Sequence, residues 1–436
     1  MRAFHCSWWN FFIAFFIWFA AAPLLPEIRK TLGLTKFELW SSSICSVAGT
    51  ILLRFALGPL CDKFGSRVLF TVILCFASIP TALTGTVQSA DGLIALRFFI
   101  GFGGSTFVMC QYWTSRMFTK KVVGTANALV GGWGNLGGGV TQIVMGSALF
   151  PLFKNVAFKD LEPDLAAEKA WRIVSVIPAV VAFGSGVMTY FISDDCPKGN
   201  YSDMKKNGTM AEVSAAASFR DGAMNFNTWL LFLQYACCFG VELTMNNAAA
   251  LYFVDRFGQT TEAAAAIASI FGWMNLFARG MGGYCSDYAN ARTGMKGRIW
   301  VHTVFLLIEG ILVLVFVRTA SLAGSIVVLV FFSVCVQAAE GTSYGIVPYV
   351  NPPCTGSIAG IVGAGGNTGA VCFGLCFRNL PYQKAFDIMG GTIIASSILS
   401  IFIMIEGHAG MIWGEDAPEE KKVETLQVPE AVEESA

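Results

Sequence analysis

Two arginines lie inside long apolar stretches of the sequence, Arg54 in the first half and Arg279 in the second. An arginine at the centre of a membrane helix costs about 2.5–3.5 kcal/mol even on a lenient insertion scale, and it keeps its proton at physiological pH. Each is therefore a fixed positive charge that needs a partner. One interpretation is a buried ion pair with Glu242 or Glu340, the clearest carboxylates in apolar stretches. The interpretation we favour is a pair of clamps for a small oxyanion, because a planar guanidinium can donate two parallel hydrogen bonds.

The two arginines occupy equivalent places in an internal repeat. An arginine, a glycine and an aspartate recur at intervals of four, as Arg54, Gly58, Asp62 and again as Arg279, Gly283, Asp287. A second repeat joins residues 131–137, Gly-Gly-Trp-Gly-Asn-Leu-Gly, to residues 363–369, Gly-Ala-Gly-Gly-Asn-Thr-Gly. The two matches indicate two related halves about an axis normal to a membrane, with a site between them near the midplane.

Each glycine-rich segment carries one polar amide, Asn135 in the first and Asn367 in the second. Glycines in membrane helices usually allow close packing of helices, and we interpret most of these glycines in that way. A buried amide without a partner costs free energy. For Asn135 we favour an anion oxygen as the partner, whereas for Asn367 a bound anion and a neighbouring backbone carbonyl are equal alternatives.

The elements that must position these residues are membrane helices. Of the 436 residues, 55% are apolar and 13% are charged, about half the charged share of a soluble domain. A spanning helix needs about 20 apolar residues, and the sequence predicts twelve such runs in a lipid bilayer: 8–26, 40–60, 68–87, 92–117, 122–149, 171–192, 228–254, 263–285, 299–318, 322–349, 356–378 and 385–406. The net charge of zero gives no indication of nucleic acid, and the scattered cysteines and histidines predict neither a metal nor a cofactor.

A polar stretch divides the twelve runs six from six. We expect an N-terminal six-helix half at 1–192, a central loop at 193–227, a C-terminal six-helix half at 228–406 and a disordered acidic tail at 407–436. Lysines and arginines are more frequent in alternate loops, which favours a cytoplasmic location for both termini and for the central loop. The expected fold is all-α, with twelve transmembrane helices in two pseudo-symmetric halves.

Residues 58–67, Gly-Pro-Leu-Cys-Asp-Lys-Phe-Gly-Ser-Arg, follow the second run. They resemble the signature of the major facilitator superfamily, and this resemblance implies the fold of that superfamily. A glycine at position 65 permits a turn, and Asp62 can meet the N-terminus or basic flank of a neighbouring helix. The residues expected to act as a gating latch are Gly58, Asp62, Lys63, Gly65, Arg67, Gly283 and Asp287.

Five further segments resemble the nitrate/nitrite porter family within that superfamily, especially its eukaryotic high-affinity branch. They are residues 19–24, 106–113, 132–139, 239–244 and 363–369. The resemblance covers nearly all of the twelve-helix core. It implies uptake of nitrate, with nitrite second, across the plasma membrane by proton symport. In some eukaryotic relatives a small accessory membrane protein is required.

The resemblance also implies roles for single residues. In that family one arginine from each half binds the anion, two aromatic rings sandwich it, and a tyrosine and a signature asparagine contribute. The matching residues, in that order, are Arg54, Arg279, Phe107, Phe239, Tyr235 and Asn135. Packing is the alternative for both phenylalanines, since the chain contains 37 of them. The hydroxyl of a buried tyrosine needs a partner in any case.

Uptake of an anion into a negative interior needs a driving ion, because the membrane potential opposes it by about 2.3 kcal/mol per 100 mV for each charge. Glu242, one turn from Phe239, is the first candidate for proton coupling and Glu340 is the second. For both, a structural pairing with an arginine is the alternative.

Other functions would share parts of this pattern. A carrier of another small anion would have the same fold and latch, and a nitrate sensor with low flux would keep the binding site. A membrane enzyme needs a catalytic constellation inside the bilayer, and the sequence contains no Ser/His/Asp set, metal cluster or nucleotide loop. We therefore expect a transporter and not an enzyme.

Overall fold

The computed structural model describes residues 2–118, 123–197, 199–207, 215–351 and 355–415, and within these ranges the elements are helices. The spans of the first half are α1 (Arg2–Phe19) with α2 (Leu25–Leu32), α3 (Lys36–Phe64), α4 (Ser66–Leu83), α5 (Ala90–Ile100) with α6 (Thr106–Met117), α7 (Val123–Thr141) with α8 (Phe150–Leu152), and α9 (Pro163–Val174) with α10 (Val176–Ile192). Two short helices follow, α11 (Tyr201–Lys206) and α12 (Ala215–Met224).

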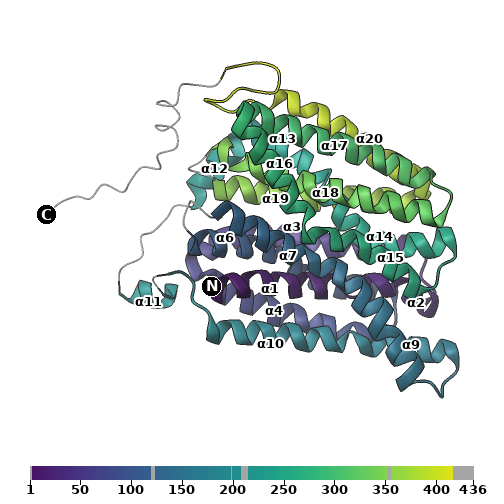
Figure 1. The fold of residues 1–436 in the computed structure, drawn as a ribbon. Helices are drawn as coiled ribbons and strands as arrows, with labels where there is room; N and C mark the ends of the chain where they lie inside the picture. The colour runs from purple at the N-terminus through teal and green to yellow at the C-terminus, as the bar shows by residue number, and fades with distance from the viewer. Residues whose placement is uncertain (1, 119–122, 198, 208–214, 352–354, 416–436) are drawn as a thin grey trace.

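The second half repeats this arrangement. Its spans are α13 (Phe226–Ala236) with α14 (Phe239–Phe257), α15 (Thr261–Trp273) with α16 (Ala278–Thr293), α17 (Met295–Arg318), α18 (Leu322–Val350), α19 (Thr355–Asn379) and α20 (Tyr382–Ile398). Ten stretches of the described residues are long and apolar enough to cross a membrane. The helix α3 and the stretch from α15 to α16 lie in the same bundle (Figure 1) and complete the twelve expected spans.

Several spans are interrupted near their middle. The break between α5 and α6 is a 3-10 turn at Gly101–Ser105, and the break between α15 and α16 is another at Met274–Leu276. Between α13 and α14 the helix is interrupted at Cys237 and Cys238. Such breaks leave backbone carbonyls without an intrahelical partner, so these carbonyls can accept hydrogen bonds from buried side chains.

Most helix boundaries agree with the expected runs to within a few residues. The largest differences are in three spans, which extend further than expected. The fifth, expected at 122–149, continues through π-helical turns as far as Ala157. The sixth begins at Pro163 and not at 171, and the eighth ends at Thr293 and not at 285.

The tail was expected to be disordered from residue 407, but the structure describes it as far as residue 415. Met411 is buried, with its sulfur 3.9 Å from the Thr303 hydroxyl, because apolar residues extend past the last helix. Residues 416–436 lie outside the described part of the chain.

The two halves lie side by side in Figure 1, the first in purple to teal and the second in green to yellow. They meet where α3 packs on α19, α7 on α15, and α2 on α14. The closest approach is between α7 and α15. There Gly139 and Gly272 face each other so closely that a Cβ on either would collide with the backbone of the other.

Further contacts join the halves at the end of the bundle where α2 ends and α15 begins, which we call the distal end. Arg29 forms an ion pair with Asp255 at 2.7 Å, and the Tyr382 hydroxyl donates to the same carboxylate at 3.0 Å. Trp40 of α3 stacks on Phe377 of α19, with ring centroids 5.0 Å apart. The Arg29–Asp255 and Trp40–Phe377 contacts hold the two halves together at the distal end.

Candidate functional site

Arg54 reaches from α3 into the interface between the halves, where it is 3% exposed. Its Nη1 donates to the Gly363 carbonyl of α19 at 2.8 Å, and its Nη2 donates to the Gly104 carbonyl at 3.1 Å. The Asn367 amide faces the same guanidinium. In the orientation assigned from hydrogen bonding, the Asn367 oxygen accepts from Nη1 at 2.8 Å and from Nε at 3.2 Å. All partners of Arg54 among the described residues are neutral.

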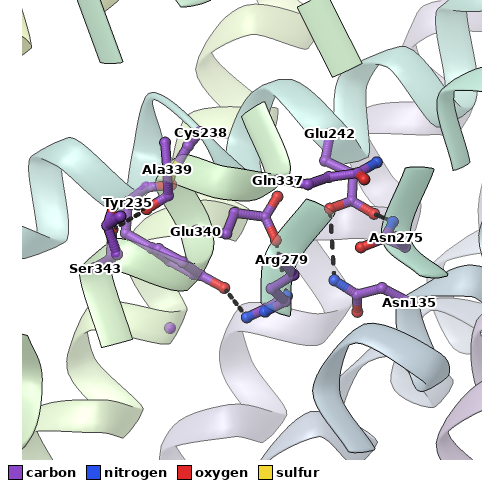
Figure 2. Close-up of polar contacts among 12 residues, drawn as sticks. Asn135, Tyr235, Cys238, Glu242, Asn275, Arg279, Gln337, Ala339, Glu340 and Ser343 are labelled. Carbon is purple, nitrogen blue, oxygen red and sulfur yellow. Dashed lines mark hydrogen bonds and ion pairs between the residues drawn. The ribbon is translucent and has the colours of Figure 1, made fainter. Parts of the chain in front are cut away.

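Arg279 lies on α16 and is 4% exposed. Its Nη1 forms an ion pair with Glu340 of α18 at 2.7 Å, and its Nη2 donates to the Tyr235 hydroxyl of α13 at 3.0 Å (Figure 2). The ion pair that the sequence offered as one alternative is therefore present for Arg279. Arg54 has no such carboxylate partner in the described part of the chain.

Aromatic rings connect the two arginines. The Phe107 ring lies 5.2 Å from the Arg54 guanidinium carbon and 5.9 Å from that of Arg279. The Phe239 ring lies 5.6 Å from Arg54 and is stacked on Phe107 at 6.5 Å between centroids, with the ring planes 29° apart. The Tyr235 ring is stacked with Phe239 at 5.3 Å between centroids. The two arginines and three aromatic residues named from the sequence thus form one cluster.

Each glycine-rich segment packs on the arginine of the opposite half. A Cβ on Gly363 of α19 would lie 3.5 Å from Arg54 Nη1, and a Cβ on Gly131 of α7 would lie 3.8 Å from Arg279 Nε. The absence of side chains at these two positions lets the helices approach the guanidinium groups closely. The sequence repeat therefore corresponds to a reciprocal contact between the halves.

Glu242 on α14 is fully buried and accepts hydrogen bonds from two amides. Its Oε1 accepts from Asn275 Nδ2 at 2.8 Å, and its Oε2 accepts from Asn135 Nδ2 at 3.5 Å (Figure 2). Its carboxyl group is also close enough to that of Glu340 for the two to interact. In this structure Asn135 thus contacts a carboxylate, which is the same kind of acceptor as an anion oxygen.

Sequence reasoning missed two residues of this cluster. Asn275 lies one helical turn before Arg279, and Tyr344 lies one turn after Glu340. The Tyr344 ring packs edge-on against Phe107 at 5.9 Å and lies 6.0 Å from the Arg279 guanidinium carbon. Because residues four apart share a helix face, a search at that spacing from the buried charged residues would have found both.

The expected latch residues lie at the opposite end of the bundle from the distal end. Gly65 has a positive φ of 82°, ends α3, and lies against the Asp195 carboxylate, with which a Cβ would collide. The Asp195 carboxylate accepts from the Arg67 backbone N–H at 3.0 Å. Burial raises the pKa of Asp195, and this hydrogen bond partly offsets the shift. Gly58, Asp62 and Lys63 belong to α3, and their surroundings lie outside what the structure describes.

The corresponding residues of the second half form a different contact. Asp287 of α16 pairs with Arg298 of α17 at 2.6 Å, so this aspartate connects two neighbouring helices of one half. A Cβ on Gly283 would meet no atom within 4 Å among the described residues. Position 283 therefore has room for a side chain, although a Cβ on Gly341 of α18 would lie 3.1 Å from the Gly283 nitrogen.

Comparisons with known proteins place the chain in a family. Residues 7–413 match the Major Facilitator Superfamily. The chain is 39% identical to "High affinity nitrate transporter 2.5" of Arabidopsis thaliana, over 97% of this chain and 83% of the relative. It is 38% identical to "High-affinity nitrate transporter 2.3" of Oryza sativa subsp. japonica, over 95% and 80% of the two chains.

More distant relatives agree with this placement. The identity to "Nitrate/nitrite transporter NrtP" of Picosynechococcus sp. is 28%, over 94% of this chain and 90% of the relative. Among solved structures, a bacterial homolog of the human lysosomal transporter Spinster, inward-facing and unoccupied, matches with a TM-score of 0.66 and 14% identity, over 91% and 94% of the two chains. This last likeness shows the fold alone. The sequence relatives are named as transporters, which excludes the enzyme alternative.

Proposed function

We propose that this chain, which belongs to the major facilitator superfamily and within it to the nitrate/nitrite porter family, carries nitrate, with nitrite as a second substrate. The observation that carries the proposal is the arginine pair. Arg54 and Arg279 come from equivalent helices of two repeated halves, and both guanidinium groups lie within 6 Å of the Phe107 ring. Substrate translocation would follow from alternating access, with the halves rocking around this shared site.

A small planar anion suits the surroundings of Arg54. The guanidinium is buried, and its partners are two carbonyls and one amide, so a bound anion would supply the missing negative charge. Its planar fork matches an oxyanion bidentately. Phe107 and Phe239 lie 6.5 Å apart, close to the separation of about 7–8 Å that a flat ion between two rings requires at contacts of about 3.5–4.0 Å on each side.

The surroundings of Arg279 suit proton coupling. Glu340 occupies Nη1 of Arg279, which an anion also needs, and the second oxygen of Glu340 has no partner among the described residues. A proton on Glu340 would neutralise it and release Arg279 for nitrate. Linkage is reciprocal, so nitrate bound at Arg279 would favour protonation of Glu340. One proton and one nitrate would then move together without net charge.

Glu242 would assist this exchange. Two amides donate hydrogen bonds to its carboxyl oxygens and fix its position. Glu340, and not Glu242, forms the ion pair with Arg279 among the described residues. The proton is therefore assigned to Glu340 and a supporting role to Glu242, which reverses the order of the two candidates expected from the sequence.

We also propose that the chain acts in the plasma membrane with both termini in the cytoplasm. The family resemblance implies the plasma membrane, and the distribution of lysine and arginine between alternate loops is the basis for the orientation. In that orientation the distal end faces outward. The family resemblance also implies a small accessory membrane protein as a partner, and we include this partner in the proposal.

The test is uptake of labelled nitrate in cells that lack their own nitrate carriers, at matched surface expression. Arg54→Lys and Arg279→Lys keep the charge but lose the bidentate geometry, and we expect both to reduce uptake more than about tenfold. Arg318→Lys, at an arginine that is half exposed near the distal end, is the matched control and should transport normally. Normal transport by both test variants would show that the arginines are structural.

The two alternatives give different outcomes in the same assay. A nitrate sensor would bind nitrate, measured as a rise in melting temperature of the purified protein, without accumulating it. A carrier of another anion would show neither effect with nitrate. If the wild type takes up nitrate only when a relative's accessory protein is co-expressed, the accessory requirement is established.

A further inference from the structure

A third arginine is buried in the membrane, away from the site described above. Arg97 on α5 is 1% exposed. Its Nη1 donates to the hydroxyls of Ser42 and Ser43 on α3, at 2.9 and 2.8 Å. Its Nη2 donates to Asn247 Oδ1 on α14 at 2.6 Å. Its Nε has no partner. Among the described residues, this cation is thus bound by neutral groups only.

Other polar groups surround the same level of the bundle. Gln142, which follows α7, donates to the Asn246 carbonyl at 2.8 Å. The side-chain nitrogen of Asn246 and the side-chain oxygen of Gln142 have no partner in the described part of the chain. Together these residues form what we call the distal polar layer. Its members are Ser42, Ser43, Arg97, Gln142, Asn246 and Asn247, each at most 5% exposed.

The distal polar layer lies between the arginine site and the distal end. Ser43 is eleven residues before Arg54 on the continuous helix α3, which corresponds to about 17 Å along the axis. Helix α3 begins at Lys36, at the distal end. Asn246 and Asn247 come from the second half and the other four members from the first, so the layer crosses the interface between the halves.

An apolar seam would close this interface without the cost of a buried cation. Arginines inside membrane segments usually mark pathways for substrates or ions, and an unpartnered buried donor costs free energy. Both features are present here, in the Arg97 guanidinium, its free Nε and the free amide of Asn246. The N–H groups of Arg97 and Asn246 could donate hydrogen bonds to an anion. Apolar side chains would pack the halves together equally well, so packing does not explain these polar groups.

We propose that the distal polar layer is a second anion-binding site, which holds a small oxyanion on its way between the distal end and the site at Arg54 and Arg279. This inference rests on the proposed function. The bond from Arg97 to Asn247 joins the two halves, so it must break when the distal end opens. That step frees Nη2 beside the already free Nε, and these two N–H groups form the edge that binds an oxyanion bidentately.

The experiment compares nitrate uptake kinetics and melting temperatures of purified protein for three variants. Arg97→Gln removes the charge, Arg97→Lys keeps it, and Asn247→Asp places a carboxylate against Arg97 and so neutralises it without removing the arginine. We expect Arg97→Gln and Asn247→Asp to raise KM about tenfold, with a smaller change in Vmax. Arg97→Lys keeps the charge but loses the bidentate edge, so its KM should lie between those of the wild type and Arg97→Gln.

A purely structural Arg97 predicts different results. In that case Asn247→Asp would lower Vmax, because a stronger contact between the halves slows opening, and it would leave KM unchanged. Arg97→Lys and Arg97→Gln would be equally destabilised. Either result would overturn the proposal. If Arg97→Gln does not fold, Asn247→Asp still decides, because it strengthens the contact between the halves.

Two controls separate this inference from the proposed function. Arg318→Gln removes a positive charge near the distal end but outside the layer, and its KM should stay unchanged. Wild-type protein that neither takes up nitrate nor gains melting temperature from it would overturn the proposed function itself. Wild-type uptake with an unchanged KM in Asn247→Asp would overturn the second site alone.

Discussion

Arg54 and Arg279 occupy equivalent positions of a repeated sequence, yet their surroundings differ in charge. Arg54 is held by two carbonyls and an amide, whereas Arg279 is held by a carboxylate and a phenol. Among the described residues, Arg54 thus lacks a carboxylate partner, whereas Glu340 already balances the charge of Arg279. The difference teaches that equivalent positions of a repeat can hold the same charge with different partners. In the function that we propose, Arg54 binds the anion, and a proton on Glu340 releases Arg279.

Neutralising each arginine should have the largest effect on nitrate uptake and tests this comparison most directly. Arg54→Gln loses two charge-assisted contacts to the ion, so we expect nitrate uptake to fall at least about 100-fold, with little change in melting temperature. Arg279→Gln should also abolish uptake and in addition destabilise the protein, because it leaves Glu340 buried without its partner. Thermal unfolding of both purified variants measures the contrast.

A double variant provides the control for that contrast. Arg279→Gln combined with Glu340→Gln removes both charges of the pair, so it should recover most of the lost melting temperature without recovering uptake. Equal melting temperatures for the two single arginine variants would contradict the asymmetry between Arg54 and Arg279.

The second test targets the switch itself. In the wild type, nitrate affinity should fall as pH rises, because ionised Glu340 competes with nitrate for Arg279. Glu340→Gln imitates the protonated acid, so nitrate exchange should persist and become independent of pH. Accumulation driven by a pH gradient should fall about tenfold or more, since no proton is bound with the anion. Proteoliposomes with imposed pH gradients measure both quantities.

Glu242→Gln is the matched comparison for that test. It removes the neighbouring negative charge but leaves the ion pair intact, so we expect a shifted pH profile with coupling retained. Complete uncoupling by Glu242→Gln, with Glu340→Gln still coupled, would exchange the roles of the two carboxylates.

The smallest expected effect comes from the glycines that face the arginines. A Cβ at Gly363 would lie 3.1 Å from the Tyr344 hydroxyl and 3.5 Å from Arg54 Nη1. Gly363→Ala should therefore displace Arg54 slightly and raise the KM for nitrate, roughly two- to fivefold. Gly131→Ala faces the Gln111 amide at 3.3 Å, and its KM should rise less. The reverse order in uptake kinetics would place the more sensitive contact at Arg279.

Much of the fold could be predicted because membrane helices need long apolar runs, and these are visible in composition. The twelve spans and the two buried arginines followed from that requirement. The ends of spans were harder to predict. The fifth span runs to Ala157 through π-helical turns, and residues near Met411 pack against the bundle, since tertiary contacts decide such ends.

The partners inside the site could not be predicted in the same way. The sequence offered Glu242 and Glu340 equally as partners of an arginine, and only the positions of α14 and α18 assign Glu340 to Arg279. Asn275 and Tyr344 are visible in the sequence only through their spacing of four from Arg279 and Glu340, and Arg97 belongs to no repeat that the sequence shows. Their roles depend on tertiary contacts, such as those of Asn275 with Glu242 and of Arg97 with Asn247.

The contact between Gly139 and Gly272 has a mechanical consequence. In a rocking cycle, the place where two bodies touch backbone to backbone is a fulcrum. Along the span formed by α15 and α16, Thr261 and Arg279 lie on opposite sides of Gly272. By helical rise, Thr261 is about 17 Å from Gly272 and Arg279 is about 10 Å from it. A lever pivoted there moves its two arms in opposite directions. If the halves rock about this contact, opening of the distal end would press Arg279 toward the first half and so couple that opening to the position of the arginine.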